Sequence, residues 1–388
     1  MKTQVSRPIK HAHRVAIRHR LLHTAAGMAL LVAPLLVARA QGQCGGARAG
    51  TPACDTTHIK APFAPTGWKT VALDHFTMHA VDYRKEAAYY ATLMNWKVRS
   101  DDGKQAVLDI GDIGSVVIVG GYEPPPPLPR PTPPPTAAGD TSGGRGGRGG
   151  GRGGAGGGPR QPPQAVWDSF SWQISPWNAK TVEAELRTRG LNPVADNDGK
   201  GFESFHVKDP DGFDVQLSNG GYVKLRKAST AKAALPAPAP FENTNWKTVW
   251  LDHISFGVTN YKESYAWYEA LLGWRPRGDE GSQNETWICD ECGNVIIRGG
   301  NPLNPTFDKT APRRASMGHI SFGITPFDAD GTKAELDKRG LTGRPDTGGK
   351  GDIHDPTATY KSYHTTSPQG FDLQISNATK ANRTVRLP

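Results

Sequence analysis

The sequence predicts an α+β protein that contains two tandem copies of one domain, and repeated segments are the first observation behind this prediction. The segment Trp-Lys-Thr-Val-Ala-Leu-Asp-His at 68–75 recurs with one substitution at 246–253. The segment Phe-Asp-Val-Gln-Leu-Ser-Asn at 213–219 recurs at 371–377 with two apolar exchanges. Self-similarity at a long, fixed period is typical of duplicated folding units, so we expect a duplicated domain.

The repeats predict a first domain at 67–225, a linker at 226–243 and a second domain at 244–385. The linker is rich in Ala and Pro, as connecting segments often are. A stretch at 122–166, first Pro-rich and then Gly/Arg-rich, interrupts the first domain. Such a composition cannot form a core, and we expect a disordered insert. Its three Arg-Gly-Gly triplets resemble RNA-binding tails, but no aromatic residue is interleaved, which favours a flexible spacer.

Each domain is predicted to contain two modules with the order strand–helix–strand–strand–strand. Apolar residues of the first and third modules are spaced by four, three and four positions, which is one face of a helix. These residues are Tyr83, Ala87, Tyr90 and Met94 in the first domain, and Tyr261, Tyr265, Tyr268 and Leu272 in the second. Helices of the second and fourth modules are expected at 181–189 and 331–339. Gly190 and Gly340 follow them, where a glycine commonly ends a helix.

Short alternating segments predict the strands between these helices. Strands are expected at 107–110, 116–119, 170–174, 286–288, 295–298 and 320–324. The segments Asp-Pro-Asp-Gly at 209–212 and Ser-Pro-Gln-Gly at 367–370 are typical turn sequences and are expected to close hairpins.

The N-terminal residues 1–40 resemble a secretory signal peptide. A basic region at 1–20 precedes an apolar run at 24–38, and Ala-Arg-Ala at 38–40 is a small-x-small cleavage pattern. The alternative is an uncleaved anchor, but no apolar run reaches the roughly 20 residues that a membrane span needs. We therefore expect a periplasmic or secreted protein with no membrane contact after cleavage.

Export would permit disulfides, and the four cysteines allow three pairings. The most local pairing joins Cys44 to Cys54 and Cys289 to Cys292. The Cys-Asp-Glu-Cys segment at 289–292 could also be half of a zinc site or a redox pair. No second Cys-x-x-Cys exists to complete a zinc site, which favours a structural disulfide or free thiols across a hairpin.

The net charge of +9 comes from the N-terminal segment and from the insert in the first domain. Without residues 1–40 the chain has 39 basic against 37 acidic side chains, and without 122–166 as well it has 34 against 35. A basic footprint over the folded part is thereby excluded, and we expect no nucleic-acid partner.

Two kinds of motif resemble the vicinal oxygen chelate superfamily, which includes glyoxalase I, bleomycin-resistance proteins and extradiol dioxygenases. The first kind is Leu-Asp-His at 251–253 and Met-Gly-His-Ile-Ser-Phe at 317–322. The second is the pair of end motifs at 209–216 and 367–374. The resemblance implies that each pair of modules forms a cupped mixed sheet around one metal ion. It also implies ligands from the first and last strands of the modules.

The second domain carries the better metal site that the resemblance implies. His253 and His319 stand at matching positions on the first strands of its two modules. Gln374 stands on the last strand, where the family usually has a Glu, although some glyoxalase-type members bind their metal through a Gln. Ile297 at the other last strand cannot bind a metal. This set is similar to the two-His-one-carboxylate site of non-haem iron enzymes, with a neutral amide in place of the carboxylate. Fe(II) is favoured, and Zn(II), Mn(II) and Ni(II) are alternatives.

His364 is a candidate catalytic residue because it lies ten residues before Gln374. Extradiol dioxygenases place an active-site Tyr at this offset, so the resemblance implies an acid/base role or an extra ligand. A two-residue turn at 368–369 would instead pair Tyr363 with Gln374. His364 would then lie on the opposite face of the sheet, unless a bulge intervened.

The first domain offers a weaker second site at His75, His206 and Gln216. Ser169 stands where His319 stands in the second domain, and Val117 and Ile118 cover the other last strand. We expect the first domain to be mainly structural. A structural first domain before a metal-binding second domain resembles the arrangement of extradiol dioxygenases.

Three functions remain open on the sequence alone. The leading hypothesis is an extradiol-type dioxygenase that acts on a small catechol-like molecule. The second is a glyoxalase-like lyase or isomerase, and the third is a non-enzymatic small-molecule-binding protein similar to bleomycin-resistance proteins. All three imply a small-molecule partner, and the chain is expected to be a monomer or homodimer.

Overall fold

The computed structural model describes residues 57–126, 162–199, 201–229, 233–237, 239 and 241–383. The predicted signal peptide at 1–40, Cys44 and Cys54 lie outside the described residues, as do most of the insert at 122–166 and part of the linker. Within the described part of the chain, no helix is long and apolar enough to cross a membrane.

The first copy of the domain forms one eight-stranded mixed sheet. Its strand order is β2-β3-β4-β1-β5-β8-β7-β6. The elements are β1 (Lys69–Ala80), α1 (Tyr83–Leu93), β2 (Lys97–Asp101), β3 (Gln105–Ile110), β4 (Gly114–Val119), β5 (Ala165–Ser175), α2 (Ala179–Thr188), β6 (Val194–Asn197), β7 (Glu203–Lys208), β8 (Asp214–Ser218) and α3 (Gly221–Ala228). The last helix runs past residue 225 into the expected linker.

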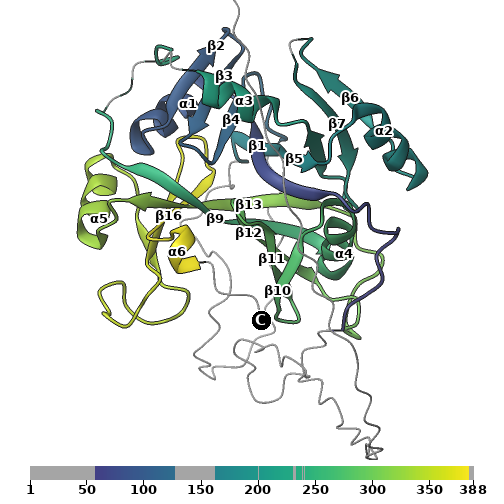
Figure 1. Ribbon diagram of the computed structural model, residues 1–388. Coiled ribbons are helices and arrows are strands. Elements are labelled where there is room, and N and C mark those ends of the chain that lie inside the picture. The colour runs from purple at the N-terminus through teal and green to yellow at the C-terminus, as the bar shows by residue number, and fades with distance from the viewer. Residues whose placement is uncertain are drawn as a thin grey trace, which may run out of the picture. The chain divides into compact units, whose positions relative to one another are not determined.

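The second copy repeats this sheet with the order β10-β11-β12-β9-β13-β16-β15-β14. The elements are β9 (Lys247–Asn260), α4 (Tyr261–Leu272), β10 (Arg275–Asp279), β11 (Gln283–Cys289), β12 (Gly293–Gly300), β13 (Ala315–Thr325), α5 (Ala329–Lys338), β14 (Arg344–Asp346), β15 (Ser362–Thr366), β16 (Asp372–Ser376) and α6 (Lys380–Arg383). Both sheets can be followed in Figure 1, where β9 and β13 run side by side.

This topology confirms the predicted fold class of two tandem domains, each a pair of βαβββ modules. In each copy the first strands of the two modules pair antiparallel, β1 with β5 and β9 with β13. Each first strand also pairs parallel with the last strand of its own module, for example β13 with β16. First and last strands therefore lie together at the centre of each sheet, and the two modules of one copy complete a single sheet.

The first helix of each copy forms where its apolar stripe predicted, and a side chain caps its start. Asp82 accepts a hydrogen bond from the backbone N–H of Lys85 at 3.0 Å at the start of α1. Asn260 accepts one from Glu263 at 3.2 Å at the start of α4. The predicted stripes of α1 and α4 are all buried: Tyr83, Ala87, Tyr90 and Met94, and Tyr261, Tyr265, Tyr268 and Leu272.

The last hairpin of the second domain differs from the predicted register. Residues 367 and 371 pair across it, so the loop has three residues, and Gly370 takes a positive φ of 92°. A type I turn followed by a left-handed glycine adds one residue to a two-residue turn. His364, rather than Tyr363, therefore pairs with Gln374, and the two share one face.

A second register correction concerns the other last strand of this domain. Ser321 pairs with Gln374, and its counterpart Ser255 pairs with Ile296. Ile296, not Ile297, is therefore the position that matches Gln374. The conclusion that this strand offers no ligand is unchanged, because both side chains are aliphatic.

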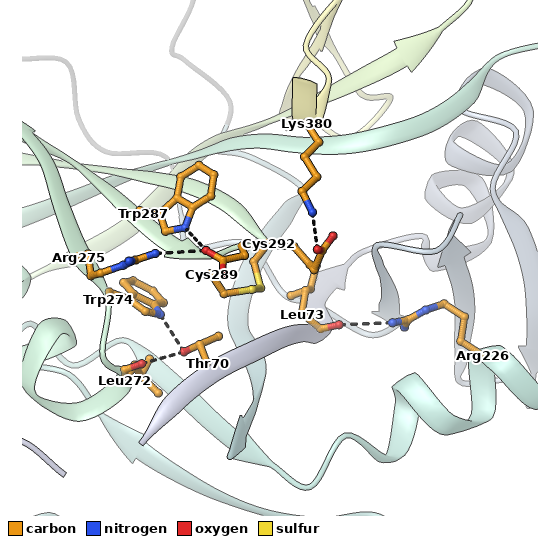
Figure 2. Close-up of a disulfide and its surroundings, with 12 residues drawn as sticks. Thr70, Leu73, Arg226, Leu272, Trp274, Arg275, Trp287, Cys289, Cys292 and Lys380 are labelled. Atoms are coloured by element: carbon orange, nitrogen blue, oxygen red, sulfur yellow. Dashed lines mark hydrogen bonds and ion pairs between the residues drawn. A yellow bond between two sulfur atoms is a disulfide. The ribbon is translucent and has the colours of Figure 1, made fainter. Parts of the chain in front are cut away.

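The two copies exchange equivalent contacts. Trp96 stacks on Tyr90 and donates its Nε1–H to Thr248 Oγ1 of the second copy at 2.9 Å. Trp274 stacks in the same way on Tyr268 of its own copy, 4.7 Å between ring centroids. Its Nε1–H is donated to Thr70 Oγ1 at 3.0 Å (Figure 2).

The expected disulfide between Cys289 and Cys292 is present at the turn between β11 and β12 (Figure 2). Both cysteines are buried. The backbone N–H of Cys292 also donates to the carbonyl of Cys289 at 3.1 Å, so the bridge spans a turn that is closed by its own hydrogen bond.

Candidate metal centre

His253 lies on β9 with a defined ring orientation. Its Nδ1 is 3.0 Å from Asp252 Oδ2. Burial alone would raise the pKa of Asp252, but contacts with His253, Arg383 and Tyr360 outweigh burial and lower it. An ionised carboxylate can only accept hydrogen bonds, so Nδ1 of His253 donates to it and Nε2 is the ring nitrogen left to face other groups. A carboxylate that orients a histidine in this way is common in metal sites.

His319 on β13 faces His253. The two Nε2 atoms are 3.0 Å apart. Burial, together with repulsion from the His253 and His364 rings, lowers the pKa of His319 to about 3, so its ring is neutral at pH 7. Two nitrogens bound at about 2.1 Å and at right angles to one ion would also lie about 3.0 Å apart. The two rings are therefore already spaced as neighbouring metal ligands.

Gln374 on β16 has an amide orientation that its neighbours determine. Ser362 donates its hydroxyl hydrogen to the Asp346 carbonyl at 2.9 Å, and Tyr360 donates its own to Asp252. Both hydroxyl oxygens must therefore accept from Gln374 Nε2, at 2.8 and 3.0 Å. Gln374 Oε1 is buried and has no hydrogen-bond partner among the described residues.

An unpartnered buried amide oxygen costs about 1–3 kcal/mol, so it calls for a missing partner. A cation is a suitable partner, because amide oxygens bind metal ions. The residues His253, His319 and Gln374 thus fit a divalent ion by their chemistry: two imidazoles and one amide oxygen without a hydrogen bond.

His364 on β15 lies beside this set, on the same face as Gln374. Its Nδ1 is 3.1 Å from Asp372 Oδ1 and its Nε2 is 3.4 Å from Asp346 Oδ2. Burial lowers the pKa of His364, but the hydrogen bonds to Asp346 and Asp372 outweigh burial and raise it. The ring stands nearly perpendicular to His319 at 4.9 Å between centroids. The two carboxylates thus favour the protonated form of a ring that lies next to His319.

His319 also belongs to a second possible donor set. His319, His364 and Asp372 each have one potential donor atom within 4.8 Å of the others. Asp372 is shared with Arg344, 2.7 Å away, and both nitrogens of His364 face carboxylates. These partners occupy the donor atoms of His364 and Asp372, whereas Gln374 Oε1 has none. The structure thus offers two candidate donor sets that share His319, and the set with His253 and Gln374 is the one that the sequence predicted.

The first domain has the same frame with one imidazole missing. His75 Nδ1 is 3.1 Å from Asp74 Oδ2, as in the second domain. Ser169 occupies the register position of His319 and is buried. The ring of Tyr222, from α3, lies 4.3 Å from the His75 ring and covers it.

The other residues of the weaker second site keep their own partners. His206 Nδ1 is 2.7 Å from Asp214 Oδ1. Gln216 Nε2 donates to Ser204 Oγ at 2.7 Å and to Asp196 Oδ2 at 3.2 Å, and its Oε1 has no partner among the described residues. Within the described ranges, no group of three potential donors includes His75 or His206.

Sequence reasoning missed the carboxylates around the site. Asp252 and Asp372 had a signal, because both lie inside the repeated motifs, at 246–253 and 371–377. Asp346 had none: it ends a three-residue strand, 28 residues before Gln374. Tyr360 also lay outside every repeated motif.

The comparisons with known proteins concern solved structures. No protein-family model matches the chain, and no curated protein matches it. The chain is similar to the Mn(II)-bound glyoxalase from Novosphingobium aromaticivorans, with 14% identity over 80% of this chain and 82% of that one, and a TM-score of 0.49. It is also similar to homoprotocatechuate 2,3-dioxygenase from Arthrobacter globiformis, with 15% identity over 85% and 87% and a TM-score of 0.48.

A third similar structure is homoprotocatechuate 2,3-dioxygenase from Brevibacterium fuscum in complex with 3,4-dihydroxyphenylacetate. The identity is 14% over 81% of this chain and 82% of that one, with a TM-score of 0.49. These proteins are a glyoxalase and extradiol dioxygenases, the kinds of protein that the motifs resemble. The fold assignment itself rests on the strand order and registers of the two sheets.

Proposed function

We propose that the second domain binds a divalent metal ion and that the protein is an extradiol-type dioxygenase for a small catechol-like molecule. The observation that carries the proposal is the pair of His253 and His319 Nε2 atoms, 3.0 Å apart, together with the unpartnered Oε1 of Gln374 on β16, the strand that pairs with β13. His253, His319 and Gln374 would hold the ion, for which Fe(II) is favoured. A bound Fe(II) would supply the redox chemistry by which a catechol reacts with O2.

The chain's own contribution would be orientation and proton transfer. Asp252 holds the His253 ring with Nε2 toward His319. His364 is held between Asp346 and Asp372, which favour its protonated form and would suit it to donate a proton. A general acid acts within hydrogen-bond reach of its substrate, and the face shared by His364 and Gln374 supports that role.

Gln374 favours a second candidate, a glyoxalase-like isomerase or lyase. Some glyoxalase-type proteins bind their metal through a Gln, as the sequence resemblance implied. Zn(II), Mn(II) or Ni(II) would then polarise a substrate carbonyl rather than take part in redox chemistry.

The test compares equivalent histidines of the two domains. Protein purified without oxygen is analysed for metals, reconstituted with Fe(II), and assayed for O2 consumption with a catechol. We expect one ion per chain and catechol-dependent O2 uptake. His253→Ala should abolish both, and the matched control His75→Ala should leave both unchanged.

Each other outcome has its own meaning. Metal binding without O2 uptake, combined with isomerase activity on a carbonyl substrate, would favour the glyoxalase-like candidate. Folded protein that takes up no Fe(II), Zn(II), Mn(II) or Ni(II) would contradict both metal-dependent candidates. It would leave a metal-free small-molecule-binding protein.

A further inference from the structure

We propose that Asp346 is a positioning residue of the metal centre. Through the Gln374 amide, Asp346 would supply the negative charge that a carboxylate ligand would otherwise bring. The inference rests on the proposed metal site in the second domain. It concerns how a neutral amide can serve there, and it assigns a role to a residue on the edge strand β14.

The first step is the contact between the two side chains. Asp346 Oδ2 is 3.4 Å from Gln374 Nε2. The hydroxyls of Ser362 and Tyr360 already require that this end of the amide is the NH2 group, as their own hydrogens are used elsewhere. Asp346 therefore faces the NH2 group, whose two hydrogens are donated to the two hydroxyls, and the carboxylate acts on it at 3.4 Å through its charge. The amide cannot rotate to offer Oε1 on this side without placing it against a carboxylate.

The second step is electronic. A carboxylate next to the NH2 group of an amide attracts its hydrogens, and amide resonance transfers electron density to the oxygen. Partners that accept hydrogen bonds from a metal ligand raise the basicity of that ligand in the same manner. Gln374 Oε1 is the unpartnered end of this amide. It thereby gains the negative character that its residue type lacks.

The third step is that the arrangement occurs twice. In the first domain, Gln216 Nε2 is 3.2 Å from Asp196 Oδ2 and 2.7 Å from Ser204 Oγ. Ser204 donates to the Asp196 carbonyl at 3.1 Å, so the orientation of this amide is determined in the same way. The Gln–Ser–Asp unit is thus a property of the repeated domain. Asp196 provides a matched control, because its domain has one imidazole fewer.

Asp346 also connects the ligand to the candidate acid. The same Oδ2 atom is 3.4 Å from His364 Nε2. One carboxylate oxygen thus contacts both the Gln374 amide and the His364 ring. Because this oxygen is used in both contacts, Asp346 acts as a partner of the ligand and is not itself a ligand.

The experiment measures metal binding without reference to turnover. Metal-free protein is titrated with Co(II), which is followed by its visible absorption, for wild type, Asp346→Asn and Asp196→Asn. We expect Asp346→Asn to bind about 10–100-fold more weakly, the usual effect of removing a partner of a metal ligand. Asp196→Asn should bind as wild type does. Thermal unfolding of the metal-free variants verifies that all are folded.

A second variant separates positioning from direct binding. Gln374→Glu brings a charged ligand, so the negative charge no longer has to come through the amide. In that background Asp346→Asn should lower the Co(II) affinity by less than about threefold. An equally large loss in both backgrounds would overturn the inference, as would Asp346→Asn with wild-type affinity. Wild type that binds no Co(II) or Fe(II) would instead contradict the proposed function, and the inference with it.

Discussion

The two cups of this protein share one hydrogen-bonded frame and differ in what fills them. His75 and His253 are each oriented by the preceding aspartate, at 3.1 and 3.0 Å. His253 then meets a second imidazole, whereas the equivalent of that imidazole in the first domain is Ser169. Tyr222 covers the His75 ring instead. A duplicated fold can therefore keep the support of a site while one copy loses a ligand and fills the space with an aromatic ring.

The frame persists in the first domain because its groups stabilise each other. Gln216 is almost fully buried, and its Nε2 needs the acceptors on Ser204 and Asp196. Removing one partner from a buried pair leaves the other unsatisfied, at a cost of about 1–3 kcal/mol. These polar contacts therefore contribute to the stability of the first domain in their own right.

The largest expected effect is the conversion of the first cup into a second metal site. Ser169→His restores the missing imidazole, and Tyr222→Ala removes the ring that covers His75. We expect the double variant to bind a second equivalent of Co(II) in the titration used for wild type. The physical reason is that His75 and Gln216 already have the partners of their counterparts.

The control for this change is Ser169→Ala with Tyr222→Ala, which opens the cup without adding a ligand. It should bind no more metal than wild type. A folded Ser169→His, Tyr222→Ala variant with no additional ion would show that the two frames differ by more than these two residues.

The turn that joins the last two strands of each copy packs on the first helix of the other copy. Gln369 accepts from the backbone N–H of Asp82 at 2.8 Å and contacts Glu86 on α1. Tyr268 on α4 donates its hydroxyl to Asp209 at 2.9 Å. The buried acid is thus Glu86 of the helix at one interface and Asp209 of the turn at the other.

The second prediction uses the pH dependence of the Glu86 interface. Burial raises the pKa of Glu86 from 4.5 to about 7, against opposing hydrogen bonds from Ser367 and Gln369. Because the folded pKa is the higher one, the stabilisation is complete below pH 4.5 and is lost as the pH rises through 7. Glu86→Gln should be more stable than wild type by about 3 kcal/mol at pH 8 and by under about 1 kcal/mol at pH 5.

Denaturant unfolding at the two pH values measures this difference. Glu183→Gln is the control, because Glu183 is a partly exposed residue of α2 whose ion pair is with the exposed Arg187. It should change stability little at either pH. A Glu86→Gln variant with the same effect at pH 5 and pH 8 would contradict the assigned burial.

Periodicity and repeats can be read directly from the order of the residues, which is why the modules, helices and first-strand histidines could be predicted from the sequence. The register of the last hairpin could not, because it depends on the positive φ of Gly370 and the residue that this adds to the loop. Asp346 was out of reach for another reason. Its role arises only when a three-residue edge strand meets Gln374, and nothing in its own segment marks it.

The smallest expected effect concerns the β-turn that carries the disulfide. Ile110 and Ile113 occupy this position in the first domain, where the backbone N–H of Ile113 donates to Ile110 at 3.0 Å. Cys292 and Cys289 make the same bond at 3.1 Å. The bridge closes a short loop, so Cys289→Ala with Cys292→Ala should cost at most about 2 kcal/mol in denaturant unfolding.

The exposed turn residue Asp290 provides the control for this comparison. Asp290→Ala should cost under about 0.5 kcal/mol, since its pair with Arg275 is largely exposed. A loss above about 4 kcal/mol in the cysteine variant, beyond what so short a loop can contribute, would mean that the second hairpin needs its bridge to form. The first hairpin forms the same turn with two isoleucines. We therefore expect the backbone hydrogen bond, rather than the disulfide, to be the main stabilising contact of this turn in both copies.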